Sequence, residues 1–144
     1  MRTIILILGL SVAVTGCQQP RDGTYEGQGR FEGMTVAVAP GSDGKPVVSD
    51  KAAAPSKAVV TVTKSSENGL TFDVNGWCKL DLGLSRDSLT AKTAKPQKCD
   101  FDGEPHEVKA SATFTPGNDM TLSVSASAYN AEPRSYKFEG KLAR

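Results

Sequence analysis

Apolar and polar side chains alternate along most of the chain after residue 24. Apolar side chains occupy every second position, with threonine, serine, glycine or charged residues between them. The alternating runs cover residues 24–31, 34–38, 60–63, 70–75, 78–85, 89–93, 108–115, 120–128 and 136–142. A period of two is typical of a strand with one buried and one solvated face, which occurs in antiparallel sheets. The pattern predicts an all-β fold, either a single antiparallel β-sandwich or an up-and-down β-barrel of about seven to nine strands.

Turn signals separate these runs. Asn68-Gly69 predicts a type I′ hairpin turn, because both residue types tolerate positive φ. Asn75-Gly76 predicts a second turn or bulge, and residues 116–119 a third turn. Residues 40–57 are rich in Gly, Pro, Ala, Ser and Lys, so they predict a mobile loop with at most a short strand at Val47-Val48.

Small residues suggest how the sheet closes. Gly27 and Gly29 lie in the first run and Gly140 lies in the last, where glycine permits close backbone approach or strong curvature. We therefore expect the first and last strands to pair, which would hide the sheet edges. Small inward side chains argue against a wide lumen at one end; they are Ala110, Ala112, Ala126 and Ala128.

The first 17 residues carry a targeting pattern. A single charge at Arg2 precedes the apolar run 4–14, which is too short to cross a bilayer and suits a secretory signal. Val14-Thr15-Gly16-Cys17 resembles the lipobox of bacterial lipoproteins, with valine in place of the usual leucine. The resemblance implies that residues 1–16 are a signal peptide and that Cys17 is lipidated, carrying diacylglycerol and an amide-linked chain such as palmitate. The alternative is an ordinary secretory signal with an incidental cysteine.

The same resemblance implies a location outside the cytoplasm. Residue 18 is Gln, not the Asp that retains many such proteins in the inner membrane. This favours the outer membrane, with the protein facing the periplasm or the cell surface. Residues 17–23 would be the lipidated cysteine and a short tether, and residues 24–144 a single β domain.

The net charge of the chain after residue 16 bears on which classes of partner it can bind. Removal of residues 1–16 leaves 144 − 16 = 128 residues and takes one of the 17 Lys and Arg with it, so 16 basic residues face 16 acidic ones. A neutral domain has no broad electrostatic attraction for nucleic acid. We therefore expect no nucleic-acid partner.

Two cysteines remain after Cys17. Cys78 and Cys99 form an even pair in an oxidising compartment, so a structural disulfide is expected. Their spacing is not that of a CxxC redox motif or of a zinc site.

The one polar cluster surrounds the only histidine. Asp100, Asp102 and Glu104 begin like a calcium-binding loop, but the pattern then departs from the EF-hand and Lys95 and Lys98 lie just upstream, so no metal or cofactor is expected. His106 could serve in acid–base catalysis, but no motif places a nucleophile beside it.

Trp77 precedes Cys78 and is expected to pack in the core, with ligand contact as the alternative. Three functions remain open. The preferred hypothesis is a non-enzymatic, membrane-anchored interaction module with a protein partner in the cell envelope. The alternatives are a small-ligand carrier, whose strand pattern resembles lipocalins only in general form, and a hydrolase that uses His106.

Overall fold

The computed structural model describes residues 20–32, 35–38, 47–50, 54–101, 104–127 and 134–143. The predicted signal peptide, Cys17, Asp102 and Ala128 lie outside these ranges. No helix long and apolar enough to cross a membrane occurs within them. Their strands are β1 (Gly23–Glu32), β2 (Thr35–Val38), β3 (Val47–Asp50), β4 (Ser56–Ser66), β5 (Gly69–Val74), β6 (Cys78–Leu84), β7 (Thr90–Lys92), β8 (Gln97–Phe101), β9 (Glu104–Phe114), β10 (Asp119–Ser127) and β11 (Arg134–Leu142).

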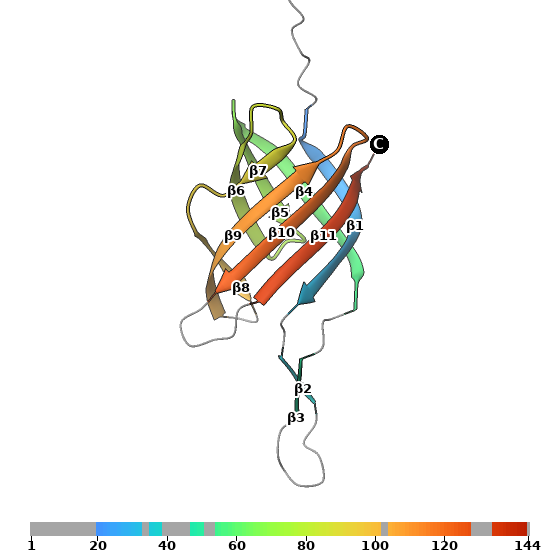
Figure 1. The fold of residues 1–144 in the computed structure, drawn as a ribbon, viewed down its shortest axis with the longest axis vertical. Helices are drawn as coiled ribbons and strands as arrows, with labels where there is room; N and C mark the ends of the chain where they lie inside the picture. Colours follow the sequence, from blue (N-terminus) through green and yellow to red (C-terminus); the bar gives the residue numbers. More distant parts are fainter. Residues whose placement is uncertain are drawn as a thin grey trace, which may run out of the picture.

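Eight of these strands close into an antiparallel barrel, and β8 is an extra strand on its wall (Figure 1). The order around the barrel is β1, β4, β5, β6, β7, β9, β10 and β11. β2 and β3 form a separate hairpin between β1 and β4 in the sequence. The all-β prediction is confirmed, and of its two forms the up-and-down barrel is the correct one.

The first and last strands of the barrel pair, as expected. β1 and β11 run antiparallel in register from Tyr25 opposite Leu142 to Glu32 opposite Ser135. β9 and β10 pair without interruption, from Phe114 opposite Met120 to Glu107 opposite Ser127. The ladder therefore continues around the barrel, which leaves few unpaired edge groups on this side.

The backbone pairing between β6 and β7 is short. β7 and β8 share one edge of β9, but β6 pairs with β7 only at Gly83 and Leu84. Beyond that point the Gln97 side chain acts like a peptide group. Its Nε2 donates to the Asp81 carbonyl at 2.6 Å, and its Oε1 accepts from the Asp81 N–H at 2.9 Å. A side-chain amide thus continues the link between β6 and β8 where backbone pairing ends.

A disulfide joins the same two strands on the inside. Cys78 and Cys99 are bonded, with Cα atoms 5.4 Å apart, and both side chains are buried. The predicted pairing is confirmed. A bridge that closes a loop of this length stabilises a fold by about 3 kcal/mol, chiefly by limiting the unfolded chain.

The β4–β5 turn differs from the prediction. It is centred on Glu67 and Asn68, while Gly69 already pairs with Ser66 in the ladder. Neither Asn68 nor Gly69 has a positive φ. The cause is an irregularity in the pairing between Lys64 and Ser66, which shifts the turn by one residue toward the N-terminus.

The type I′ geometry occurs in the next hairpin. Asn75 and Gly76 have φ of 50° and 77°, and the Trp77 N–H donates to the Val74 carbonyl at 3.0 Å. Asn and Gly suit this turn because both adopt the left-handed conformation readily. The prediction of a turn or bulge here is confirmed as a turn.

The segment 40–57 is predicted to be a loop with at most a short strand at Val47-Val48; β3 contains these two residues and extends to Asp50. β3 pairs with β2 over four residues, and β4 begins at Ser56. Residues 39–46 and 51–53 lie outside the described residues.

Inward side chains fill the barrel. The largest fully buried hydrophobic ones are Tyr25, Phe72, Phe138, Leu80, Leu82, Met120 and Leu122. Ala110, Ala112 and Ala126 are also buried, in agreement with their predicted inward positions. The interior is therefore a packed core, as expected for a small barrel of about eight strands.

Glycines make room for two of the inward rings. Gly27 lies opposite Gly140 in the β1–β11 ladder, and a Cβ at Gly27 would collide with the Glu139 carbonyl. A Cβ at Gly29 would collide with the Tyr136 hydroxyl, and one at Gly140 with the Phe138 ring. The absence of Cβ atoms lets strongly curved strands pair beneath aromatic rings.

The two ends of the barrel differ. The proximal end, where β1 begins, holds Arg21, the last residues of β11 and the turns at 67–68, 85–89 and 115–118. The distal end holds the 75–77 turn, the end of β1 and, beyond the barrel, the β2–β3 hairpin (Figure 1).

The β1–β11 closure gives a first prediction. Gly27→Ala should lower the free energy of unfolding by about 2 kcal/mol or more, because the added methyl meets backbone that cannot move aside. Gly83→Ala is the matched control: its nearest neighbour is the Lys92 carbonyl at 3.8 Å, so we expect a neutral or slightly stabilising effect. Urea unfolding of both variants would measure this. Equal midpoints would contradict the proposed close approach.

Candidate functional site

The predicted polar cluster lies on the β8–β9 hairpin. Asp100 and Glu107 are exposed, whereas His106 is 1% exposed and points into the barrel. The sequence does not predict β8, because its charged residues are typical of a solvated turn. Asp102 and the side chain of Glu104 lie outside the described part of the chain. Among the residues described, no three His, Cys, Asp or Glu side chains gather as a metal site would require.

His106 is a neighbour of the disulfide. It lies directly opposite Cys99 in the β8–β9 pair, and both residues occupy inward positions. Glu107, the next residue along, faces outward because successive strand residues alternate. The histidine and this acid are therefore on opposite faces of the wall.

Trp77 belongs to an aromatic cluster at the distal end. Its ring centroid lies 5.6 Å from that of Phe31 and 5.4 Å from that of Tyr136, the latter contact edge-on. Phe31 and Tyr136 are 4.8 Å apart. Tyr136 is buried, and its desolvation raises the pKa of the hydroxyl. The cluster covers the core at this end, and Trp77 and Phe31 remain partly exposed.

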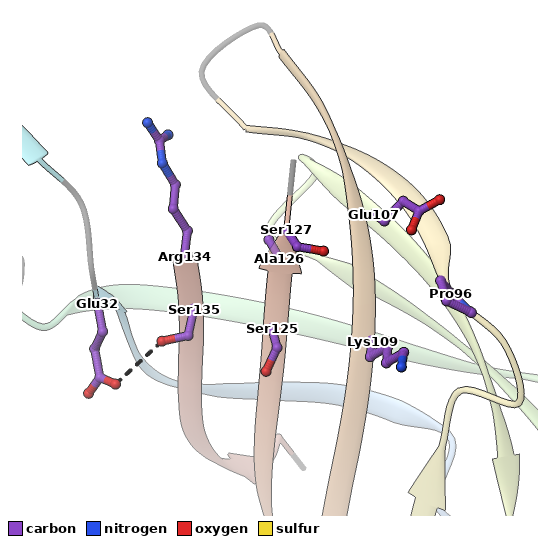
Figure 2. A pocket seen from close by; sticks show the side chains of 9 residues that line it. All are labelled: Glu32, Pro96, Glu107, Lys109, Ser125, Ala126, Ser127, Arg134 and Ser135. Carbon is purple, nitrogen blue, oxygen red and sulfur yellow. Dashed lines mark hydrogen bonds between the residues drawn. The ribbon is translucent and has the colours of Figure 1, made fainter. Parts of the chain in front are cut away.

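An open groove lies on the outer face of the wall near the distal end. We call it the distal groove; its volume is about 460 Å³. Its lining residues are Glu32, Pro96, Glu107, Lys109, Ser125, Ala126, Ser127, Arg134 and Ser135 (Figure 2). They come from β1, β9, β10, β11 and the segment before β8.

Strand register explains the shape of the distal groove. Lys109 on β9 lies opposite Ser125 on β10, Ser125 opposite Ser135 on β11, and Ser135 opposite Glu32 on β1. The row thus crosses four strands, with short serine side chains between two long charged ones (Figure 2). At about 4.8 Å per strand it spans about 14 Å. The serines form a low floor and the charged side chains form its walls.

Glu32 is the most constrained charge in the distal groove. Its carboxylate lies 2.8 Å from Arg30 Nη2 and 3.4 Å from Lys137 Nζ, and it accepts a hydrogen bond from the Ser135 hydroxyl at 3.5 Å. Desolvation raises the pKa of the Glu32 carboxyl. The hydrogen bond and charge of Lys137 and the charge of Arg30 outweigh this, so the pKa lies below its ordinary value of 4.5.

Sequence reasoning did not find the distal groove. Its residues are scattered from position 32 to 135 and share no motif. The only available signal was the serine-rich outer face of residues 121–127, which the alternation marks as solvated sheet. The groove depends on which strands become neighbours, and this was not known from the sequence.

Comparison with known proteins finds no matching family model, curated protein or solved structure.

The charges around Glu32 give a second prediction. Lys137→Gln should raise the pKa of Glu32, because it removes the cation that contributes most to the lowering. Lys141→Gln is the control, since Lys141 pairs with Asp119 at 3.5 Å instead. NMR titration of the Glu32 side chain would measure both. An unchanged Glu32 pKa in Lys137→Gln would contradict the contact.

The sign of the pH effect follows from the lowered pKa. The folded state favours the carboxylate, so its small stabilising contribution is present above about pH 4.5 and is lost as the pH falls through the lowered value.

Proposed function

We propose that the mature protein is a lipid-anchored, non-enzymatic module of the bacterial cell envelope that binds another protein through the distal groove. The observation that carries this proposal is a hydroxyl-floored groove on the outside of a barrel whose interior is packed with side chains. Because side chains fill the core, binding at the outer surface is favoured over the alternative function, in which the barrel would enclose and carry a small ligand.

The expected position of the lipid anchor supports binding at the distal groove. Cys17 precedes Pro20 by three residues, and an extended chain covers about 3.5 Å per residue. Lipid on Cys17 would hold the proximal end within about 10 Å of the attachment point. The distal groove lies on the wall near the other end of the barrel and would be held at a distance from the membrane, where a partner can reach it.

The chemistry of the distal groove suits a polar protein surface. Two acidic side chains, Glu32 and Glu107, are balanced by two basic ones, Lys109 and Arg134. Ser125, Ser127 and Ser135 add hydroxyl groups that donate and accept hydrogen bonds. Polar contacts of both signs are common in reversible protein interfaces, where charge pairing sets specificity and encounter rate. We infer a partner that presents both an acidic and a basic group to this row.

The anchor can be tested by lipid labelling. We expect Cys17→Ala to abolish incorporation of labelled palmitate and to release the protein from washed membranes, because a stable anchor needs the acyl chains on this residue. The double variant Cys78→Ala, Cys99→Ala is the control and should still be labelled. Label retained by Cys17→Ala would contradict the anchor.

Site-specific photocrosslinking tests the groove. A photoreactive phenylalanine at Ser125, in the groove, should form a discrete protein adduct in intact cells. The same probe at Thr61, which is exposed on β4 three strands away, should not. Thr61 shares the outward orientation and the small size of Ser125, so it controls for general collision.

Competition makes the result specific. Excess wild-type protein should suppress the Ser125 adduct, whereas protein carrying Ser135→Arg should compete about tenfold less well, because the arginine fills the floor of the row. Equal adducts at Ser125 and Thr61, or equal competition by both proteins, would contradict the proposed contact surface.

A further inference from the structure

A buried arginine closes the proximal end of the barrel. Arg21 is 5% exposed; its Nε donates to the Ser88 carbonyl at 2.9 Å and its Nη1 to the Thr115 carbonyl at 3.1 Å. The guanidinium carbon lies 5.3 Å from the Phe114 ring centroid. The Arg21 carbonyl accepts a hydrogen bond from the Tyr25 hydroxyl at 3.0 Å. These contacts hold the guanidinium in one place.

The charge of Arg21 is not neutralised by these contacts. Carbonyl oxygens and an aromatic face satisfy some of its five N–H groups, but no described carboxylate forms an ion pair with it. Buried cations in proteins are generally paired with an anion, because desolvation of an isolated charge is costly. The proximal end therefore holds a buried positive charge that has no described carboxylate as counter-ion and that a bound anion could pair with.

A second buried polar group adjoins this charge. Ser88 is 2% exposed, and its hydroxyl has no hydrogen-bond partner among the described residues. Its φ is 56°, in the left-handed region that serine rarely adopts. A non-glycine residue in this conformation with a buried, unsatisfied hydroxyl is a combination that often marks functional positions.

A cavity of about 140 Å³ is lined by both residues. Liquid water occupies about 30 Å³ per molecule, so the space can hold a phosphate-sized group. Lys64 adds a second cation to the lining, and Asp22 and Glu67 add two carboxylates from exposed positions. The cavity therefore combines buried groups that suit an oxyanion with an acidic rim that suits an ammonium group.

We propose that this cavity binds a zwitterionic phospholipid headgroup, with the phosphodiester at Arg21, Ser88 and Lys64 and the ammonium group at Asp22 and Glu67. Guanidinium and hydroxyl donors bind phosphate oxygens through charge-assisted hydrogen bonds. The cavity lies at the end of the barrel that the Cys17 anchor would hold against the membrane. The site would then fix the orientation of the barrel on the lipid surface, while the distal groove stays accessible.

The test uses the full chain in a phosphate-free detergent, titrated with glycerophosphoethanolamine, the water-soluble headgroup. We expect saturable NMR shifts of the Arg21 Nε–H and the Ser88 amide. Ser88→Ala and Lys64→Gln should each weaken binding about tenfold, because each removes one donor to the phosphate. Both variants avoid Arg21, whose removal could unfold the proximal end. Thr63→Ala is the matched control. Thr63 is exposed on β4 and does not line the cavity, so this variant should leave the affinity unchanged.

A titration with inorganic phosphate distinguishes a phospholipid headgroup from free phosphate as the ligand. Inorganic phosphate should bind at least fivefold more weakly than glycerophosphoethanolamine, because it lacks the ammonium group. Equal affinity would overturn the headgroup assignment, and absence of saturable shifts, or shifts unaffected by Ser88→Ala, would overturn the site itself. None of these outcomes depends on the distal groove or its partner, so this proposal and the proposed function can fail separately.

Discussion

The pairing of β1 with β11 is the constraint on which the rest of the structure depends. It joins the two ends of the sheet and turns alternating strands into a closed wall with an inside and an outside. The glycines of these strands make the pairing sterically possible, because a Cβ at Gly27 or Gly29 would meet backbone or the Tyr136 hydroxyl. The row from Lys109 to Glu32 crosses the β11–β1 junction, so the distal groove exists only in the closed barrel.

On the opposite side of the barrel, side chains join strands that lack a continuous backbone ladder. β6 and β8 lack the continuous ladder that joins β1 to β11, yet the Gln97 amide binds the Asp81 backbone and the Cys78–Cys99 bond links the strands inside. The disulfide restricts the unfolded chain, and the amide satisfies backbone groups that would otherwise need water. A long backbone ladder closes one side of the barrel; on the other side, two side-chain links supplement the short β6–β7 pairing.

The two ends of the barrel have different chemistry, and this difference underlies both proposals. The proximal end buries a cation and an unsatisfied hydroxyl beside a small cavity, features that suit an oxyanion. Near the distal end, small hydroxyls and balanced charges lie on an open outer surface, which suits contact with a protein. If Cys17 anchors the chain, the first end faces lipid and the second faces the aqueous compartment. The two functions would then be separated by the height of the barrel and carried by different strands.

Local patterns in the chain predict most of the strands, the antiparallel class, the close approach of the first and last strands and the disulfide, because each depends on alternation, glycine placement or cysteine number. The sequence pattern misplaced the β4–β5 turn, since a register irregularity at Lys64 and Ser66 outweighed the preference of Asn68-Gly69. It also missed β8 and the first residues of β9, where charged outward side chains concealed the alternation; Cys99 on β8 and His106 on β9 are the inward residues of this hairpin. The choice of barrel over sandwich, the alignment of Ser125 with Ser135 and the position of Arg21 beside Ser88 arise only in the folded chain. Those outcomes depend on contacts between residues far apart in the chain, and no local pattern encodes which distant strands become neighbours.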